Sequence, residues 1–439
     1  MLSIGLYSVF SESELTTKVF NDTAMHMMSV IWHMLFCKAM RERMIIGMRV
    51  YGGSVKRAVS VFLAVISVLL LMPVPKAAAQ TPELPAKAVV LMEYSSGEVL
   101  AEDDAHEKLP CASITKVMTL LLVFEAIEQG VLRYEDILTA SAHAAGMGGS
   151  DIWLREGEQM SVDDLIKACV VMSANDAAVV LAEAISGTEE AFVARMNERA
   201  QELGMYDTVF KNCNGLDEEG HLTSAYDVAI MSRALMAHER IFDYTLIWID
   251  YVRGGDTQLV NTNKLVRSYK GIKGLKTGTT GAAGSCISAC AERNGMTLIA
   301  VVLGAENTND RFSAAASLMD YGFSNWKTVK PESPELPVLP VRNGMEDTVQ
   351  AVCDAPSEVL VPVSGASSVE VKIQLPEELS APVEAGQQIG KLSVLLNGDT
   401  VEELPIKAEN KVDAITFKSA FQYVLRNFFG CTSSKVSDV

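Results

Sequence analysis

A serine and a lysine stand three residues apart in an otherwise apolar segment, PCASITKVMT at 110–119. On a helix, Ser113 and Lys116 would lie on the same face. A serine hydroxyl is a poor nucleophile until a base takes its proton, and a neutral lysine amine one turn away could be that base. Taken alone, the pair could equally be two polar surface residues, so its interpretation depends on the rest of the chain.

Two further motifs follow in order along the chain. Ser173-Ala174-Asn175 falls on a loop expected between two helices, and Lys276-Thr277-Gly278 falls on an expected strand. S-x-x-K alone is common by chance. Together, with the first motif at a helix start and the third on a strand, S-x-x-K, S-x-N and K-T-G are typical of β-lactamases and penicillin-binding proteins. The set predicts an enzyme with a nucleophilic serine.

The chemistry suggests a role for each residue. The base, Lys116, must be neutral, and burial together with the positive charge of Lys276 would lower its pKa. The start of the helix supplies backbone N–H groups and positive potential for a developing oxyanion. Ser173 can pass a proton toward the leaving amine, and Asn175 can hold the substrate amide.

The strand motif supplies the expected substrate-binding residues. Lys276 would point into the cleft as an electrostatic group and proton relay. Thr277 offers a hydroxyl to a carboxylate. Gly278 lets a substrate backbone approach closely as an added strand.

The stretch from about 84 to 430 resembles the D-alanyl-D-alanine carboxypeptidases, the low-molecular-mass penicillin-binding proteins. Besides the three motifs, the segments GGSDIWLREGEQMSVDDLIKACVVMSANDAAVVLAEAISG and NGLDEEGHLTSAYDVAIMSRAL are similar to the helical lobe of that family. The resemblance implies an acyl-enzyme on Ser113, peptidoglycan stem peptides ending in D-Ala-D-Ala as substrate, and β-lactams as covalent inhibitors. It also implies an oxyanion hole from the backbone N–H groups of Ser113 and Thr279, with Arg311 near the substrate carboxylate. Two positions depart from the family: Cys111 replaces an expected proline, and Thr279 stands where some relatives have histidine.

The pattern of elements predicts an α+β fold. Hairpins are expected at 87–103 and at 285–305, where Asn294-Gly295 forms the turn. Helical spacing with start and stop signals fills much of the region between them, and a last helix is expected at 309–323. An antiparallel sheet flanked by helices, plus a helical lobe, fits this order and resembles the β-lactamase/transpeptidase fold.

Composition shifts divide the chain into further parts. We expect residues 1–47 to be an extension upstream of the true start, at Met44 or Met48. Residues 48–79 are expected to be a signal peptide cleaved after Ala79. The alternative for this segment is a transmembrane helix, but its apolar run at 58–72 is short for a membrane span. The catalytic domain would span 80–329, a Pro-rich linker 330–337, and a small all-β domain 338–411. An amphipathic helix at 412–430 precedes a polar tail, 431–439.

The aromatic face of the helix at 412–430 has two interpretations. It could lie in a membrane interface, which is the interpretation we favour. It could instead dock on its own β domain or on a partner. With the signal peptide, the first interpretation places the protein outside the cytoplasm, attached to the outer face of the cytoplasmic membrane.

Composition and motif searches exclude several other classes. The net charge of −18 argues against a nucleic-acid partner. No H-E-x-x-H or other zinc pattern occurs, so we expect no metal and no cofactor. A Ser-His-Asp triad is not expected, because no G-x-S-x-G elbow surrounds a serine that a histidine might serve. The histidines of the mature region are therefore expected at the surface or in loops. These are His106, His143, His221 and His238. Most of the eight cysteines are expected to be small buried hydrophobes.

We consider two alternative functions for this sequence. A serine β-lactamase would share the acylation step, but the chain has S-A-N rather than S-D-N and no convincing E-x-x-L-N-like segment to deacylate. An inactive peptidoglycan-binding scaffold would not need the intact motif residues. Asp176, beside Asn175, is expected to cap the following helix rather than to react.

Overall fold

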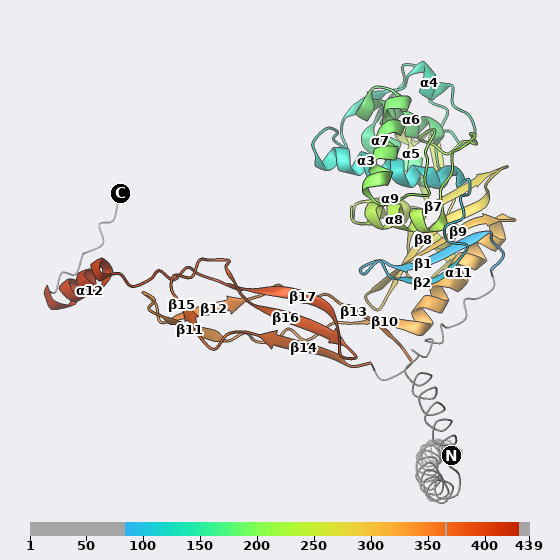
Figure 1. The fold of residues 1–439 in the computed structure, drawn as a ribbon. Coiled ribbons are helices and arrows are strands. Elements are labelled where there is room, and N and C mark those ends of the chain that lie inside the picture. The colour runs from blue at the N-terminus through green and yellow to red at the C-terminus, as the bar shows by residue number, and fades with distance from the viewer. Residues whose placement is uncertain (1–83, 365–366, 430–439) are drawn as a thin grey trace, which may run out of the picture. The chain divides into compact units, whose positions relative to one another are not determined.

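The computed structural model describes residues 84–364 and 367–429 (Figure 1). The expected extension, the signal peptide and the polar tail lie outside these residues. Within the described part of the chain, no helix is both long and apolar enough to cross a membrane.

A five-stranded antiparallel sheet forms the centre of the catalytic region. Its strands run in the order β2-β1-β9-β8-β7. Both predicted hairpins are confirmed, and Asn294 and Gly295 join β8 to β9 with positive φ values of 52° and 84°. The strands are β1 (Ala88–Glu93), β2 (Val99–Asp103), β7 (Ile272–Thr280), β8 (Gly284–Arg293) and β9 (Met296–Ala305).

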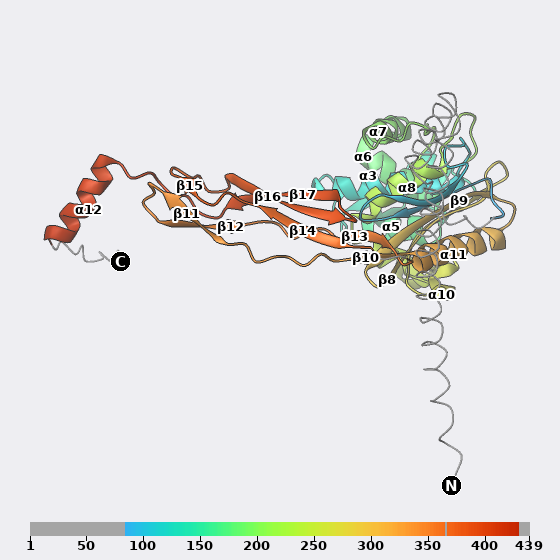
Figure 2. The same ribbon diagram turned by 60° about the horizontal axis from the view of Figure 1, so that its bottom comes forward.

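Both faces of this sheet are covered, which explains why β1 and β9 are largely apolar. Helix α11 (Thr308–Asn325) packs on one face, and α8 (Ala225–Met236) packs on the other with the lobe behind it (Figure 2). Side chains of a strand alternate between faces. Val89 and Leu91 therefore join the core under α11, whereas Val90 and Met92 join the core of the lobe.

The helical lobe is inserted between β2 and β7, as the sequence predicts. Its central helix is α3 (Lys116–Glu128), and its first residues are buried all round. Ser161 and Ser224 cap their helices by accepting the N–H of Asp164 and Asp227. The other lobe helices are α4 (Ala142–Ala145), α5 (Val162–Val171), α6 (Asn175–Ser186), α7 (Glu189–Glu202), α9 (Ile241–Thr245) and α10 (Leu265–Ser268).

Two short ladders and two 3₁₀ turns complete this region. The ladders are β3 (Ile137–Thr139) with β4 (Gln159–Ser161), and β5 (Ile249–Val252) with β6 (Thr257–Val260). The 3₁₀ turns are η1 (Ala112–Thr115) and η2 (Arg253–Gly255).

The C-terminal region is all-β, as predicted. Residues 330–337 form neither helix nor strand, but β10 (Trp326–Val329), expected within the catalytic domain, pairs with β13 (Val359–Pro362). A six-stranded sheet has the order β14-β16-β17-β12-β11-β15. Its strands are β11 (Val338–Arg342), β12 (Thr348–Val352), β14 (Val369–Gln374), β15 (Leu379–Ser380), β16 (Gln388–Leu396) and β17 (Asp399–Ala408), and helix α12 (Phe417–Phe429) follows.

Candidate active site

Ser113 lies in the 3₁₀ turn η1, immediately before α3, rather than in the α-helix itself. Its neighbour Ala112 has a φ of 51°, which is unusual for any residue but glycine, Asn or Asp. Two glycines let the backbone pass this close. A Cβ on Gly278 would lie 2.6 Å from the carbonyl oxygen of Cys111, and one on Gly215 would lie 2.0 Å from that of Ala112.

Lys116 is fully buried, and three polar atoms converge on its amine. Its Nζ lies 3.1 Å from Ser113 Oγ, 2.6 Å from Asn175 Oδ1 and 2.6 Å from the carbonyl oxygen of Asn214. The structure thus brings the first two motifs together on one nitrogen. Asn214 is a contact that the sequence analysis missed, because a backbone carbonyl leaves no side-chain signature.

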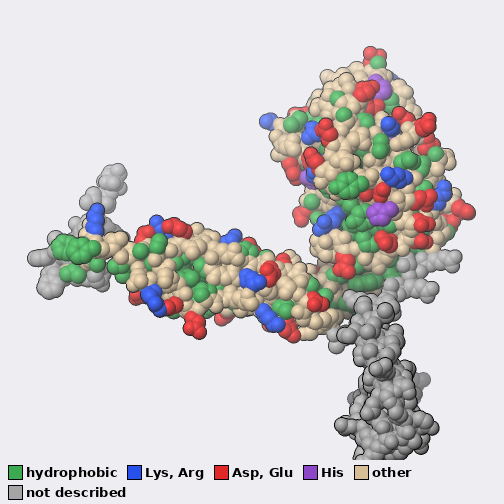
Figure 3. Space-filling view, in the orientation of Figure 1, with side chains coloured by type: hydrophobic (Ala, Val, Ile, Leu, Met, Phe, Trp, Pro, Cys, Tyr) green, Lys and Arg blue, Asp and Glu red, His purple; other side chains and the backbone are tan. Residues whose placement is uncertain are grey.

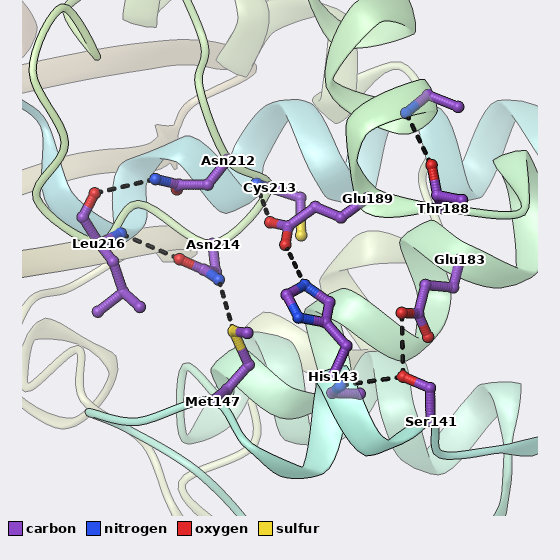
Figure 4. Close-up of polar contacts among 12 residues, drawn as sticks. Ser141, His143, Met147, Glu183, Thr188, Glu189, Asn212, Cys213, Asn214 and Leu216 are labelled. Carbon is purple, nitrogen blue, oxygen red and sulfur yellow. Dashed lines mark hydrogen bonds and ion pairs between the residues drawn. The ribbon is translucent and has the colours of Figure 1, made fainter.

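The segment that carries Asn214 is held in place by a largely buried carboxylate (Figure 4). Glu189, the first residue of α7, accepts the backbone N–H of Cys213 at 2.9 Å and lies 2.7 Å from Nε2 of His143. The Glu189 hydrogen bond raises the pKa of His143. This network fixes the carbonyl of Asn214 against the amine of Lys116.

Ser173 and Lys276 form a second polar pair. Lys276 Nζ donates to Ser173 Oγ at 2.8 Å and to the carbonyl of Thr277 at 2.8 Å, and both side chains are buried. Ser173 has a φ of 66°, a strained value set between α5 and α6. The strained residues Ala112 and Ser173 therefore lie next to or within the first two motifs.

Both polar atoms of the Asn175 side-chain amide already form hydrogen bonds. Its Oδ1 accepts from Lys116, and its Nδ2 donates to the carbonyl of Gly148 at 2.6 Å. In this structure Asn175 therefore positions Lys116, and a substrate amide would have to share or displace one of these bonds.

The end of β7 is braced by Arg311 from α11. Its Nη1 donates to the carbonyl of Gly278 at 2.9 Å and to Thr279 Oγ1 at 2.7 Å, while its buried Nε has no partner. Thr277 Oγ1 donates to Thr262 Oγ1 at 2.7 Å. Thr262 is a second contact that carried no sequence signal.

Burial lowers the pKa of both lysines. That of Lys116 falls to about 8, with desolvation as its main cause. The pKa of Lys276 lies well below its usual value, first through burial and then through the charge of Lys116. The pKa of Lys116 is lowered, as expected, and burial, one of the two expected causes, is the leading one.

Comparison with known proteins identifies the family. The family described as D-alanyl-D-alanine carboxypeptidase matches residues 75–307, and the C-terminal domain of penicillin-binding protein 5 matches 327–414. The D-alanyl-D-alanine carboxypeptidase DacF of Bacillus subtilis is 38% identical over 82% of this chain and 97% of its own length. The chain belongs to the D-alanyl-D-alanine carboxypeptidase family.

Further relatives agree with this assignment. The carboxypeptidase DacC of Escherichia coli is 34% identical over 82% of this chain and 93% of its own. Penicillin-binding protein 5 of Haemophilus influenzae, a solved structure, has a TM-score of 0.65 and 30% identity, covering 76% of this chain and 99% of that one. These matches confirm the α+β transpeptidase-like fold and a hydrolase of the carboxypeptidase class, and they do not favour the lactamase or scaffold alternatives.

Two residues outside the motifs have clear structural roles in this carboxypeptidase. His221 is in a loop as expected, but it is buried: its Nδ1 accepts from Lys211 N–H, so its Nε2–H donates to Thr115 Oγ1 at 2.8 Å. Burial lowers the pKa of His221 to about 4. Asp176, expected to cap the following helix, is instead the second residue of α6, whose N-cap is Ala174 without a side-chain hydrogen bond. Its carboxylate accepts the N–H groups of residues 152, 154 and 177.

The described cysteines and acids form no further reactive centre. Of the six described cysteines, all are free thiols and five are buried, as predicted for small hydrophobes. Across residues 84–364 and 367–429, no group of three or more His, Cys, Asp or Glu side chains is placed to hold a metal ion.

Proposed function

We propose that this carboxypeptidase releases the terminal D-alanine of peptidoglycan stem peptides through an acyl-enzyme on Ser113, with Lys116 as general base. The observation that carries the proposal is the set of three partners around Lys116 Nζ. Two of them, Asn175 Oδ1 and the carbonyl of Asn214, can only accept a hydrogen bond.

A neutral amine satisfies all three partners at once. It has two N–H groups for the two acceptors and one lone pair left for the hydroxyl proton of Ser113. A charged ammonium would have no lone pair to offer. The geometry therefore favours transfer of the Ser113 proton to Lys116 as Oγ attacks the scissile carbonyl.

Ser173 and Lys276 are suited to the second proton transfer. When the tetrahedral intermediate collapses, the bond to the leaving D-alanine breaks and its nitrogen needs a proton. The proton that Lys116 took from Ser113 passes to this nitrogen through Ser173 Oγ, which Lys276 Nζ holds at 2.8 Å, so that Lys116 is neutral again when D-alanine leaves. Water then attacks the ester on Ser113 while Lys116 takes a proton from that water, and the same proton returns to Ser113 Oγ when the ester bond breaks.

Strand β7 is suited to bind the substrate backbone because it is an edge strand of its sheet. An extended peptide can add to a free strand edge through main-chain hydrogen bonds. Because Gly278 has no side chain, the backbones of β7 and η1 lie close together. The backbone N–H groups of Ser113 and Thr279, one from each element, are therefore our candidates for the oxyanion hole. Thr277 and Arg311 remain the proposed carboxylate-binding residues.

β-Lactams are proposed to acylate the same serine. Penicillin-binding protein D2 of Listeria monocytogenes, solved with ampicillin bound, is 33% identical over 56% of this chain and 100% of its own, with a TM-score of 0.52. That likeness supports β-lactam binding here.

The proposal is tested with a peptide ending in Lys-D-Ala-D-Ala. The mature wild-type protein should release D-alanine, while Ser113→Ala should release none and keep its thermal unfolding temperature. Release by Ser113→Ala at the wild-type rate would exclude this serine as the nucleophile. Absence of release by wild type, without penicillin labelling, would favour a scaffold.

We further propose export and peripheral attachment to the outer face of the cytoplasmic membrane. The expected signal peptide at 48–79 supports export. Helix α12 supports attachment, because Phe417, Phe421 and Val424 are 87%, 53% and 52% exposed, and Figure 3 shows hydrophobic side chains on the described part of this end of the chain. Aromatic side chains of this kind suit a membrane interface.

A further inference from the structure

Trp153 is a bulky side chain that the fold itself does not explain. Its φ is 55°, in the left-handed region, which is strained for a residue other than glycine. Its side chain does not offset this strain by burial, because it is 73% exposed. Glycine would satisfy the backbone at this position without strain.

The other strained residues give Trp153 its context. Eight non-glycine residues in the described chain have positive φ, and four of these are Asn or Asp, which tolerate it. The remaining four are Ala112, Trp153, Ser173 and Arg253. Ala112 and Ser173 belong to the catalytic site, and Arg253 contacts the Trp153 backbone. In the described chain, strain outside Asn and Asp is therefore confined to these two places.

Trp153 is held in this conformation by groups on both sides of its backbone. The buried carboxylate of Asp176 accepts the N–H groups of its two neighbours, Ile152 at 3.2 Å and Leu154 at 2.9 Å. From the other side, Arg253 donates to the carbonyls of Ile152 at 2.8 Å and Trp153 at 3.5 Å, and it is itself paired with Glu158 at 2.6 Å.

The same loop is bound to the catalytic residues. The backbone N–H of Asn175 donates to the carbonyl of Ser150 at 2.6 Å, and its side chain donates to that of Gly148. Asp176 is the next residue in α6. The exposed indole of Trp153 is therefore carried by a loop that is hydrogen-bonded to Asn175, the residue that contacts Lys116.

We propose that Trp153 is a substrate-binding residue that stacks on a sugar ring of the peptidoglycan glycan to which the stem peptide is attached. This proposal rests on the proposed function. An indole offers a flat apolar face with a polar N–H at its edge, which suits a surface that is apolar on one side and wet on the other. A pyranose ring has such a surface, with C–H groups on its faces and hydroxyls around its rim, whereas the D-Ala-D-Ala end is already served by β7.

The test compares two substrates that share one stem peptide, the free pentapeptide and the disaccharide-pentapeptide. Trp153→Ala should raise KM for the disaccharide-pentapeptide roughly tenfold, the size expected when one aromatic stacking contact is removed. It should leave KM for the free pentapeptide and the rate of penicillin acylation unchanged. Trp153→Phe should retain part of the preference for the disaccharide-pentapeptide over the free pentapeptide.

Trp153→Gly separates binding from folding. Because glycine relieves the strained φ, this variant should unfold at the wild-type temperature or above it, and yet lose the preference for the disaccharide-pentapeptide. Tyr206→Ala is the matched control, since Tyr206 is a 75% exposed aromatic residue of the lobe without positive φ. This variant should leave KM unchanged for both substrates.

Three results would overturn the proposal. The first is the same KM for wild type and Trp153→Ala on the disaccharide-pentapeptide. The second is an equal rise in KM for both substrates. The third is slower penicillin acylation by Trp153→Ala, which would mean that Trp153 has a structural role. Failure of the proposed function is seen separately, because wild type would then hydrolyse neither substrate.

Discussion

At the scale of single residues, the site depends on a lysine that is buried without a carboxylate bound to its amine. Lys116 instead meets an amide oxygen, a backbone carbonyl and a hydroxyl. Desolvation disfavours the charged form of Lys116, and its neutral partners offset this cost less than a carboxylate in an ion pair would. The same environment that makes a charged Lys116 costly favours the neutral amine that the proposed base needs.

Replacement of Lys116 tests the base directly. Lys116→Ala should slow acylation by penicillin between about 100-fold and 10,000-fold, the usual contribution of a general base. Circular dichroism should show a folded protein. Acylation at close to the wild-type rate would assign the base to another group.

The pKa of Lys116 also predicts a pH profile. Acylation requires the neutral amine, so its rate should rise with pH up to about 8 and then level off. Below that value the rate should fall about tenfold per pH unit, as the fraction of neutral amine falls. Stopped-flow acylation between about pH 6 and 9 brackets this pKa, and a flat profile across that range would contradict the assignment.

At the scale of elements, the proposed site requires the turn η1 to lie close to the edge strand β7. Two backbones meet there with a glycine between them. A Cβ on Gly278 would lie 3.0 Å from the backbone nitrogen of Ser113 as well as against Cys111. Side chains cannot be added at this contact without moving the nucleophile.

Gly278→Ala should therefore impair acylation more than stability. Overpacking of this kind typically costs about 1–3 kcal/mol, which a domain of this size can tolerate. The acylation rate should fall by at least about 100-fold, comparable with loss of an oxyanion donor. Gly281→Ala, at the same end of the sheet, is the control, because a Cβ there meets nothing within 4 Å; equal effects of the two variants would contradict this account.

The sequence predicted those parts of the site that have a local signature. The hairpin with the Asn294-Gly295 turn, the helices that begin after Ser161 and Ser224, and the three motifs all have a local signature in the sequence. Asn214, Thr262 and the burial of His221 could not, because they depend on contacts between segments far apart in the chain. The strained φ of Ala112 and Trp153 was equally hidden, since neither residue type indicates it.

At the scale of the whole molecule, the chain combines a catalytic region with a β domain and a terminal helix. Strand β10, expected within the catalytic domain, pairs with β13, so the β structure begins before the Pro-rich segment. Composition marked that segment clearly, whereas strand pairing across it left no local signal. Val412, expected in the terminal helix, is instead buried and forms a bridge with Val383.

Removal of α12 tests the proposed attachment. A chain ending at Thr416 keeps Val412 in the β domain and loses the exposed aromatic helix, so it should leave the membrane fraction. Its penicillin acylation should be unchanged, because α12 contributes no residue to the site. The full-length Phe417→Glu/Phe421→Glu variant should behave alike, and membrane association that persists in both would contradict the proposal.

The most direct test of the central claim is mass spectrometry of the mature protein after brief exposure to penicillin, followed over hours. We predict one stable adduct that maps to Ser113 and is absent from Ser113→Ala. An adduct on another residue, or none at all, would contradict the account. An adduct lost within seconds would instead mark a β-lactamase.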